Sequence, residues 1–267
     1  MSRISNVIRA LESEGRKALI PYITGGDPRP EWTVNIMHGL VESGADIIEL
    51  GVPFSDPMAD GPVIQLACER ALEHDVSIDS ILDMVREFRK TDSHTPVVLM
   101  GYLNPLEIKG YERFAVDASS VGVDGVLVVD LPPEEADTLV PYLKSNDLDA
   151  IFLIAPTTTK ERIKHICEHS SGYVYYVSVK GVTGSASLIL DDVAQKVSVI
   201  NSISDIPVGV GFGIRDATSA ANISKVASGV IVGSVIVNLI DENQDSLSEI
   251  CSKVNALVLS MRKAMDS

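Results

Sequence analysis

The sequence has few of the features that mark secreted, membrane-bound or disulfide-stapled proteins. Its three cysteines, Cys68, Cys167 and Cys251, are odd in number, widely spaced and never paired as CxxC, so neither a disulfide framework nor a cysteine zinc site is expected. No apolar run approaches the roughly 18 residues of a membrane-spanning helix. The polar N-terminus lacks the apolar segment of a signal peptide. We therefore expect a cytoplasmic protein.

Basic residues are also scarce. The chain has 22 Lys and Arg against 37 Asp and Glu, a formal net charge of -15, and no basic run is present. Such a chain repels the phosphates of nucleic acids and the surfaces of anionic membranes, which argues against both as partners. Neither GxGxxG nor GK[ST] occurs, so the common nucleotide-binding loops are not indicated.

What the sequence does contain is a series of short apolar segments rich in β-formers. Hydrophobic residues make up 45% of 267 positions, enough for one large core. Most of these segments are apolar throughout, which is typical of parallel strands covered on both faces. Eight are predicted as strands: 18–24, 45–52, 96–102, 125–131, 150–155, 173–179, 207–213 and 229–234.

Amphipathic segments fill the intervals between the predicted strands. Helices are predicted over 31–43, 63–72 with 78–89, 111–121, 133–146, 160–169, 191–202, 216–226 and 247–265, and an extra helix over 4–14. Repeated strand-helix units occur both in closed barrels and in open doubly wound sheets, but eight of them favour closure. No linker or change of composition divides the chain. We predict an α/β fold: a single (β/α)8 TIM barrel over 1–267, with an extra N-terminal helix.

In such a barrel the catalytic groups lie at the carboxyl ends of the strands, and Glu49 occupies that position in the second strand. Side chains alternate along a strand, so Ile48 and Leu50 can face the helices while Ile47 and Glu49 face the interior. Burial raises the pKa of a carboxyl group and allows it to exchange protons near neutral pH. We predict a catalytic role for Glu49 over a structural one.

The long connection after that strand, 53–62, carries Asp56 and Asp60 between prolines that restrict the backbone. Aspartate beside proline or glycine is also a common turn residue. By this reasoning Asp56 is best explained as a turn residue, and for Asp60 both explanations stay open. A second long connection, 180–190, is predicted as a lid, since long loops often cover active sites.

Glycine turns end the last two predicted strands. GFG at 211–213 and GS at 233–234 lie where barrels often bind phosphate through backbone amides and a short helix N-terminus. Tight strand-to-helix turns are the structural alternative. Because both turns occur together, we predict a phosphate site.

Two other motifs point to different chemistry. His165, Glu168 and His169 match the HxxEH zinc-peptidase pattern, but they fall within a predicted outer helix, so we expect solvated side chains and no metal. Lys180 follows the sixth strand and could form a Schiff base. The glycine-rich segment after it offers no apolar wall to lower the pKa of its amine, which disfavours that mechanism.

Taken together, these segments resemble the tryptophan synthase alpha family over almost the whole chain. The most specific of them is the PFSDPxADGP run that follows the strand-end glutamate. The segments that carry the resemblance are PYITGGDP (21–28), IELGVPFSDPMADGPVIQ (48–65), YLNP (102–105), GVDGVLVVDLPPEE (122–135), GVTG (181–184) and GFGI (211–214).

The resemblance implies that the chain cleaves indole-3-glycerol phosphate into indole and glyceraldehyde 3-phosphate, with Glu49 as acid and base and Asp60 as its partner. It also implies two further groups of residues. The substrate pocket would be lined by Tyr22, Met100, Tyr102, Leu127, Tyr175 and Thr183, and the phosphate would be held by Gly184, Phe212, Gly213, Gly233 and Ser234. Tyr22 and Met100 stand where relatives often have Phe and Leu, and Val179 replaces a basic residue of some relatives.

A partner is implied by the same resemblance. Family members act with a beta chain that binds pyridoxal phosphate, in an α2β2 heterotetramer, and this chain itself would need no cofactor. Asp56, Asn104 and the 132–135 segment lie where relatives meet that partner. Two alternatives stay open at this point: a lysine-dependent aldolase that uses Lys180, and a catalytically idle subunit that binds phosphate and regulates a partner.

Overall fold

A computed structural model describes residues 2–178, 186–211 and 213–267 of the chain. The described residues form one parallel sheet, with the strand order β5-β4-β3-β2-β1-β9-β8-β7-β6. Its strands are β1 (Ala18–Thr24), β2 (Ile48–Gly51), β3 (Val97–Gly101), β4 (Gly125–Val128), β5 (Asp149–Ile151), β6 (Leu153–Ile154), β7 (Val174–Val177), β8 (Val208–Gly211) and β9 (Gly229–Val232).

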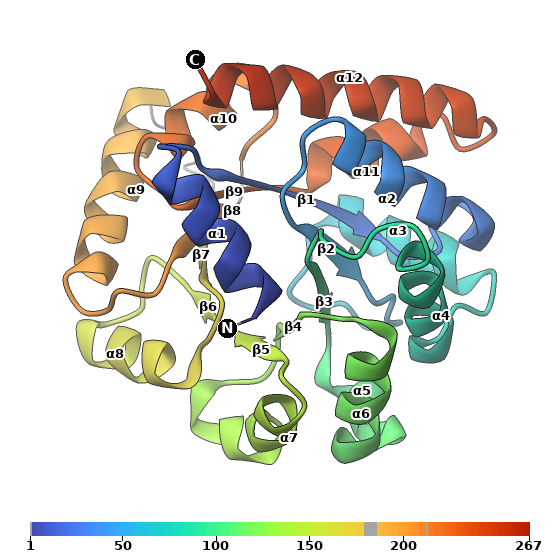
Figure 1. Cartoon of the computed structure of the whole chain (residues 1–267), viewed down its shortest axis with the longest axis horizontal. Coiled ribbons are helices and arrows are strands. Elements are labelled where there is room, and N and C mark those ends of the chain that lie inside the picture. Colours follow the sequence, from blue (N-terminus) through green and yellow to red (C-terminus); the bar gives the residue numbers. More distant parts are fainter. Residues whose placement is uncertain (1, 179–185, 212) are drawn as a thin grey trace.

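The two strands at the ends of this order, β5 and β6, follow each other directly along the chain. β5 pairs with β4 and β6 pairs with β7, while only Phe152 separates β5 from β6. What was predicted as one strand over 150–155 is therefore divided between two neighbours, because the pairing changes sides at Phe152. The sheet curls into a barrel (Figure 1), and the predicted TIM barrel is confirmed.

Helices surround this barrel (Figure 1). They are α1 (Arg3–Ser13), α2 (Thr33–Glu42), α3 (Pro62–Leu72), α4 (Ile78–Phe88), α5 (Leu103–Lys109), α6 (Tyr111–Val121), α7 (Val140–Ser145), α8 (Lys160–His169), α9 (Ala186–Asn201), α10 (Ala217–Ser224), α11 (Ser234–Asp241) and α12 (Leu247–Met265), with the 3-10 turns η1 (Pro30–Trp32) and η2 (Pro133–Thr138).

Some boundaries differ from the prediction. Two short helices, α5 and α11, were not predicted. The segment over 133–146 is divided into η2 and α7, since Leu139 between them departs from helical geometry. α9 begins at Ala186, so residues 186–190 of the predicted lid are helical, and the rest of that segment lies outside the described residues.

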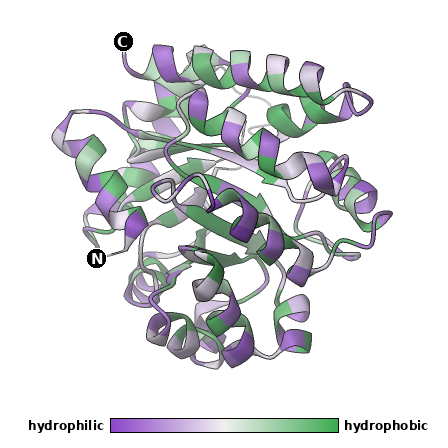
Figure 2. Ribbon diagram, turned by 45° about the vertical axis from the view of Figure 1, so that its right-hand side comes forward, coloured by the Kyte–Doolittle hydropathy of each residue, from purple (hydrophilic) through white to green (hydrophobic). Residues whose placement is uncertain are grey.

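Alternation along the strands separates two cores. Outward side chains such as Ile48 and Leu50 pack beneath the helices in the large core. Inward side chains such as Ile47 and Ile231 fill the barrel. Figure 2 shows the hydrophobic strands enclosed by helices with hydrophilic outer surfaces.

The extra N-terminal helix closes one end of the barrel. Ile4, Ile8 and Leu11 are spaced along one face of α1 and join the interior cluster, so α1 lies across the barrel in Figure 1. Arg3 at its start is paired with the buried Asp124 carboxylate. α1 therefore covers the amino ends of the strands; the opposite end of the barrel, where the strands have their carboxyl ends, is called the mouth below.

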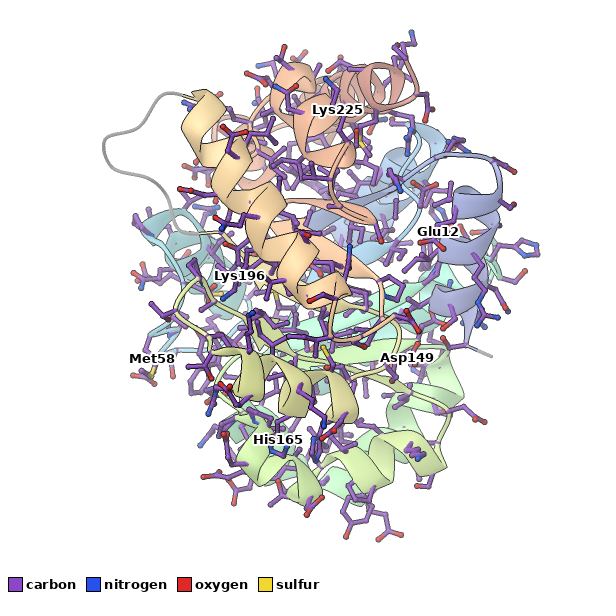
Figure 3. All side chains as sticks on the ribbon, turned by 90° about the vertical axis from the view of Figure 1, so that its left-hand side faces the viewer. Glu12, Met58, Asp149, His165, Lys196 and Lys225 are labelled. Atoms are coloured by element: carbon purple, nitrogen blue, oxygen red, sulfur yellow. The ribbon has the colours of Figure 1, made fainter. Side chains whose placement is uncertain are left out.

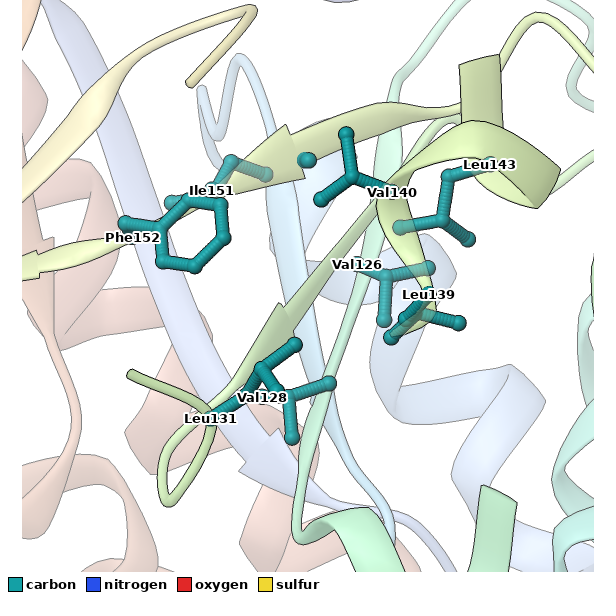
Figure 4. Close-up of a pocket in the computed structure, with 9 residues that line it drawn as sticks. Val126, Val128, Leu131, Leu139, Val140, Leu143, Ile151 and Phe152 are labelled. Carbon is teal, nitrogen blue, oxygen red and sulfur yellow. The ribbon is translucent and has the colours of Figure 1, made fainter. Parts of the chain in front are cut away.

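One small defect interrupts the large core. A cavity of about 10 Å³ lies between β4, β5 and the η2–α7 segment (Figure 4). Its walls are apolar and offer no polar partners for an ordered water. The cavity is lined by Val126, Val128, Leu131, Leu139, Val140, Leu143, Ala150, Ile151 and Phe152.

Candidate active site

Glu49 is a fully buried carboxyl group inside the barrel. Its neighbours Ile48 and Leu50 point outward into the large core, as the alternation of residues predicts. Burial raises the pKa of Glu49 to about 7, against the opposing effect of a hydrogen bond from Tyr173. Among the described residues its Oε2 atom has no hydrogen-bond partner. An oxygen of this carboxyl group is thus free to exchange a proton near neutral pH.

Tyr173 holds the other oxygen. Its hydroxyl donates to Oε1 of Glu49 at 2.5 Å, across the barrel from β2. Sequence reasoning did not identify Tyr173 as a functional residue. Its position two residues before Tyr175 could have revealed it, because residues i and i+2 of a strand share one face.

Asp60 is held by a tyrosine that directly follows the neighbouring strand β3. The Tyr102 hydroxyl donates to Oδ2 of Asp60 at 2.8 Å and accepts from the Ala59 amide at 3.0 Å. The side chain of Gln65 donates to the Asp60 carbonyl at 3.0 Å. Burial raises the pKa of Asp60, and the Tyr102 hydrogen bond opposes that rise. The loop therefore presents this carboxyl group in a defined position.

Four of the predicted pocket residues lie on inward positions of the strands. Tyr22 is beside Glu49 in the sheet register. Met100, Leu127 and Tyr175 belong to the interior cluster or pack against it. Burial, followed by the negative charges of Glu49 and Asp60, raises the pKa of Tyr175. Both carboxyl groups thus act on the same space at the barrel mouth.

Two glycines make room for the aromatic walls. A Cβ atom on Gly51 would lie 2.2 Å from the Tyr22 hydroxyl, and one on Gly211 would lie 2.1 Å from the Tyr175 hydroxyl. Any larger residue would displace these rings. The Tyr22 hydroxyl also lies 3.1 Å from the hydroxyl of Thr24, which gives the pocket wall a polar point that phenylalanine would lack.

Two of the predicted phosphate residues lie at the start of a helix, and a third, Gly213, follows β8. Gly233 is the residue before α11 and Ser234 is its first residue, and no side chain in the described part of the chain caps this end. Gly213 has φ +80°, and no atom of the described residues lies within 4 Å of where its Cβ would be. Uncapped amides and the helix dipole favour an anion at such a position.

Three predicted site residues, Thr183, Gly184 and Phe212, lie outside the described residues, as does Lys180. The HxxEH motif lies on the outer helix α8, with His165 far from the barrel interior (Figure 3). Within the described ranges no group of three or more His, Cys, Asp or Glu side chains is arranged to hold a metal. None of the described helices is long and apolar enough to cross a membrane.

Comparison with known proteins places these features in one family. The family model for the tryptophan synthase alpha chain matches residues 8–266. The chain is 63% identical to that of Marinobacter nauticus, covering 100% of this chain and 99% of the relative, and 60% identical to that of Thioalkalivibrio sulfidiphilus, covering 100% of both.

Solved structures agree. The crystal structure of tryptophan synthase subunit alpha from Legionella pneumophila is 47% identical with a TM-score of 0.92, covering 100% of this chain and 99% of the other. A structure of Mycobacterium tuberculosis tryptophan synthase is 38% identical with a TM-score of 0.88, covering 99% and 98%.

Proposed function

The chain belongs to the tryptophan synthase alpha-chain family, lyases that cleave indole-3-glycerol phosphate in tryptophan biosynthesis, and we propose how its own residues carry out that cleavage. The products are indole and glyceraldehyde 3-phosphate. The observation that carries the assignment is the fully buried Glu49 at the mouth that it shares with Asp60, with a pKa near 7 and one oxygen that has no partner among the described residues.

Glu49 is the group that moves protons. Cleavage needs a proton on indole carbon C3, which converts the ring into a cationic indoleninium. The C3′ hydroxyl then loses its proton, its electrons form the aldehyde, and the electrons of the C3–C3′ bond return to the ring. A carboxyl group with a pKa near 7 is suited to give the first proton and to accept the second. Tyr173 orients it by holding Oε1.

Asp60 stabilises the cation that forms between these steps. Its carboxylate would accept a hydrogen bond from the indole N–H, and its charge would favour the indoleninium. The Tyr102 hydroxyl fixes one of its oxygens, which leaves Oδ1 for the substrate. We thus assign Tyr102 a role in positioning Asp60. The substrate pocket that they share is lined by Tyr22, Met100, Leu127, Tyr175 and Thr183.

The phosphate of the substrate would bind at Gly233 and Ser234. The uncapped start of α11 and the open backbone at Gly213 support this assignment, since backbone amides bind anions without a basic side chain. Gly184 and Phe212 complete the proposed phosphate site.

Family members function with a beta chain. We propose an α2β2 complex in which pyridoxal phosphate belongs to the beta chain and this chain needs no cofactor. Two large exposed hydrophobic side chains support a docking surface near the mouth: Met58 on the Asp60 loop and Ile108 on α5 (Figure 3 labels Met58). The three unpaired cysteines fit a reducing compartment such as the cytoplasm.

The assignment of Glu49 is tested by replacing it with glutamine, which keeps the shape and loses proton transfer. We expect the Glu49→Gln protein to fold and to lose about 10²- to 10⁴-fold in kcat for indole release. Glu42→Gln, on the outer helix α2, is the matched control and should retain activity. Turnover near that of the unmodified chain in a folded Glu49→Gln protein would refute the assignment.

A further inference from the structure

One arginine joins three parts of the molecule that surround the proposed site. Arg70, near the end of α3, donates from Nε and Nη2 to the two carboxylate oxygens of Asp27, at 2.7 and 2.9 Å. Its remaining nitrogen, Nη1, lies 2.8 Å from Oδ1 of Asp241 at the end of α11. The planar guanidinium is suited to this, because it can form a fork with one carboxylate and still bind a second.

Asp27 is the fixed point of this cluster. Its side chain has no exposed surface, and it lies in the turn that follows β1. That turn is bound to the end of β2 through a hydrogen bond from the Gly25 amide to the Gly51 carbonyl at 2.9 Å. A buried carboxylate without its partner is costly, so Arg70 is held firmly against the barrel.

The other two parts that Arg70 joins are the helices α3, which carries Arg70, and α11, which carries Asp241. Both helices begin at the proposed site. α3 starts at Pro62, two residues after Asp60, and α11 starts at Ser234 beside the proposed phosphate position. At 1.5 Å per residue, Arg70 and Asp241 lie only about 10–12 Å along their helices from those starts.

The two helices also pack against each other between these points. Ala67 of α3 and Val237 of α11 have no exposed surface and form one cluster with Tyr22. Close-packed helices move as units rather than deform. A shift of α11 at its phosphate end is therefore transmitted to α3 and to the loop that carries Asp60.

We propose that Arg70 is a positioning residue that couples phosphate binding at the start of α11 to the placement of Asp60. This rests on the proposed roles of Asp60 and of Gly233 with Ser234. With both aspartates bound, Arg70 fixes the relative position of the two helices, and phosphate that orders α11 also orders the carboxylate that receives the indole N–H.

Cooperative binding of two small probes tests the coupling without turnover. The dissociation constant of indole is measured by equilibrium dialysis, with and without saturating glycerol 3-phosphate. In the unmodified chain glycerol 3-phosphate should tighten indole binding at least about fivefold. By linkage, indole must tighten glycerol 3-phosphate binding by the same factor, which is an internal check.

Two variants remove the coupling in different ways. Arg70→Lys replaces the fork by a single ammonium group, and Asp241→Asn weakens only the arm to α11 and leaves the buried Asp27 paired. Both should lower the cooperative factor below about twofold. Arg86→Lys is the matched control, since its ion pair with Asp83 lies on the exposed face of α4, and it should keep the full factor. If Arg70→Lys does not fold, the cooperative factor of Asp241→Asn alone tests the coupling.

The outcomes separate the coupling from the function on which it rests. A purely structural role would lower the melting temperature of both variants and leave the cooperative factor unchanged, which would overturn the proposal. An unmodified chain without cooperativity would overturn it as well. Asp60→Asn should weaken indole binding directly; if it does not, the proposed role of Asp60 is wrong whatever the Arg70 variants show.

Discussion

At the scale of single residues, the proposed chemistry depends on how Glu49 is solvated. The group has no contact with water and only one hydrogen bond in the described part of the chain. Burial disfavours its charged form, and Tyr173 compensates for only part of that cost. The same imbalance that suits Glu49 to proton transfer must therefore weaken the folded state whenever Glu49 is ionised.

This cost predicts a pH dependence of stability. The pKa of Glu49 is about 7 in the folded chain against 4.5 for an ordinary glutamate, so the folded state retains the proton over a range in which the unfolded state has lost it. Its contribution to stability is complete below pH 4.5 and is lost as the pH rises toward 7. Relative to Glu49→Gln, the unmodified chain should lose at most about 3 kcal/mol of unfolding free energy over this range.

Urea unfolding of both proteins at pH 4 to 8 measures this difference, because other titrating groups are shared and cancel. The Gln variant should gain relative stability as the pH rises. A difference that stays constant with pH would mean that Glu49 has an ordinary pKa in the folded chain.

The inward direction of Glu49 could be predicted from the sequence, because alternation beside Ile48 and Leu50 depends only on local geometry. Its partner could not. Tyr173 is 124 positions away along the chain and meets Glu49 only because the sheet closes. The bond from Tyr102 to Asp60 also depends on the shape of a loop, which residue types alone do not specify.

At the scale of secondary structure, α11 turns a local backbone feature into a proposed binding site. Its uncapped amides and helix dipole are offered to the phosphate in a chain of net charge -15. Because these backbone groups carry no titratable charge, the site itself adds no pH dependence to phosphate binding.

We therefore expect phosphate to account for much of the affinity of substrate analogues. Indole propanol phosphate should bind much more tightly than indole propanol in calorimetry, since only the former reaches the start of α11. Ser234→Pro removes one amide hydrogen, and proline suits the first position of a helix. This variant should show a smaller difference in affinity between the two analogues. Equal affinities of the two analogues for the unmodified chain would contradict the proposed phosphate site.

The cavity beneath α7 leads to a prediction about stability. Leu143 is almost fully buried and lines this space. Leu143→Ala should cost about 2–5 kcal/mol of unfolding free energy, because it adds its own volume to an existing void. Denaturant unfolding measures the loss, and Leu259→Ala on the partly exposed outer face of α12 is the control. A cost below about 1 kcal/mol would show that α7 collapses to fill the space.

Long and strongly patterned elements could be predicted closely. The helices over 111–121, 160–169 and 247–265 match the structure residue for residue. α11 could not, because Val235, Ile236, Val237, Leu239 and Ile240 make it apolar on most sides and hide its helical period. α5 is only about two turns long and contains Pro105, which an early helix position tolerates.

At the scale of the whole molecule, the barrel itself could be predicted from the count of strand-helix units. The change of partner at Phe152 could not, because it arises from closure of the sheet and leaves no pattern in the sequence. The position of the proposed partner surface likewise depends on which loops lie together at the mouth.

That surface leads to a prediction about the beta chain. Ile108 is 81% exposed on α5, next to the Asn104 position that the family resemblance assigns to the interface. Ile108→Lys should weaken the complex about tenfold, because a charge replaces an apolar contact, and should leave the basal turnover of the isolated chain unchanged. Leu259→Lys, also exposed but on α12, is the control.

Titration of beta chain into each variant, while indole release is followed, tests this. The unmodified chain should be activated, since a partner that binds the catalytically active arrangement of Asp60 more tightly than other arrangements shifts the population toward it. Activation of Ile108→Lys at the same beta-chain concentrations as the unmodified chain would place the interface elsewhere.

The strand order also determines when each strand can pair while the chain is being synthesised. β1 to β5 can pair in the order in which they are made, but β1 then keeps one edge open until β9 is made. β9 is made about 80 residues after β5, which takes roughly 4 to 16 s at the usual rates of translation. During this interval the nascent chain presents an unpaired strand edge, a ready template for wrong pairing, and this is the period in which we expect the growing polypeptide to depend most on chaperones.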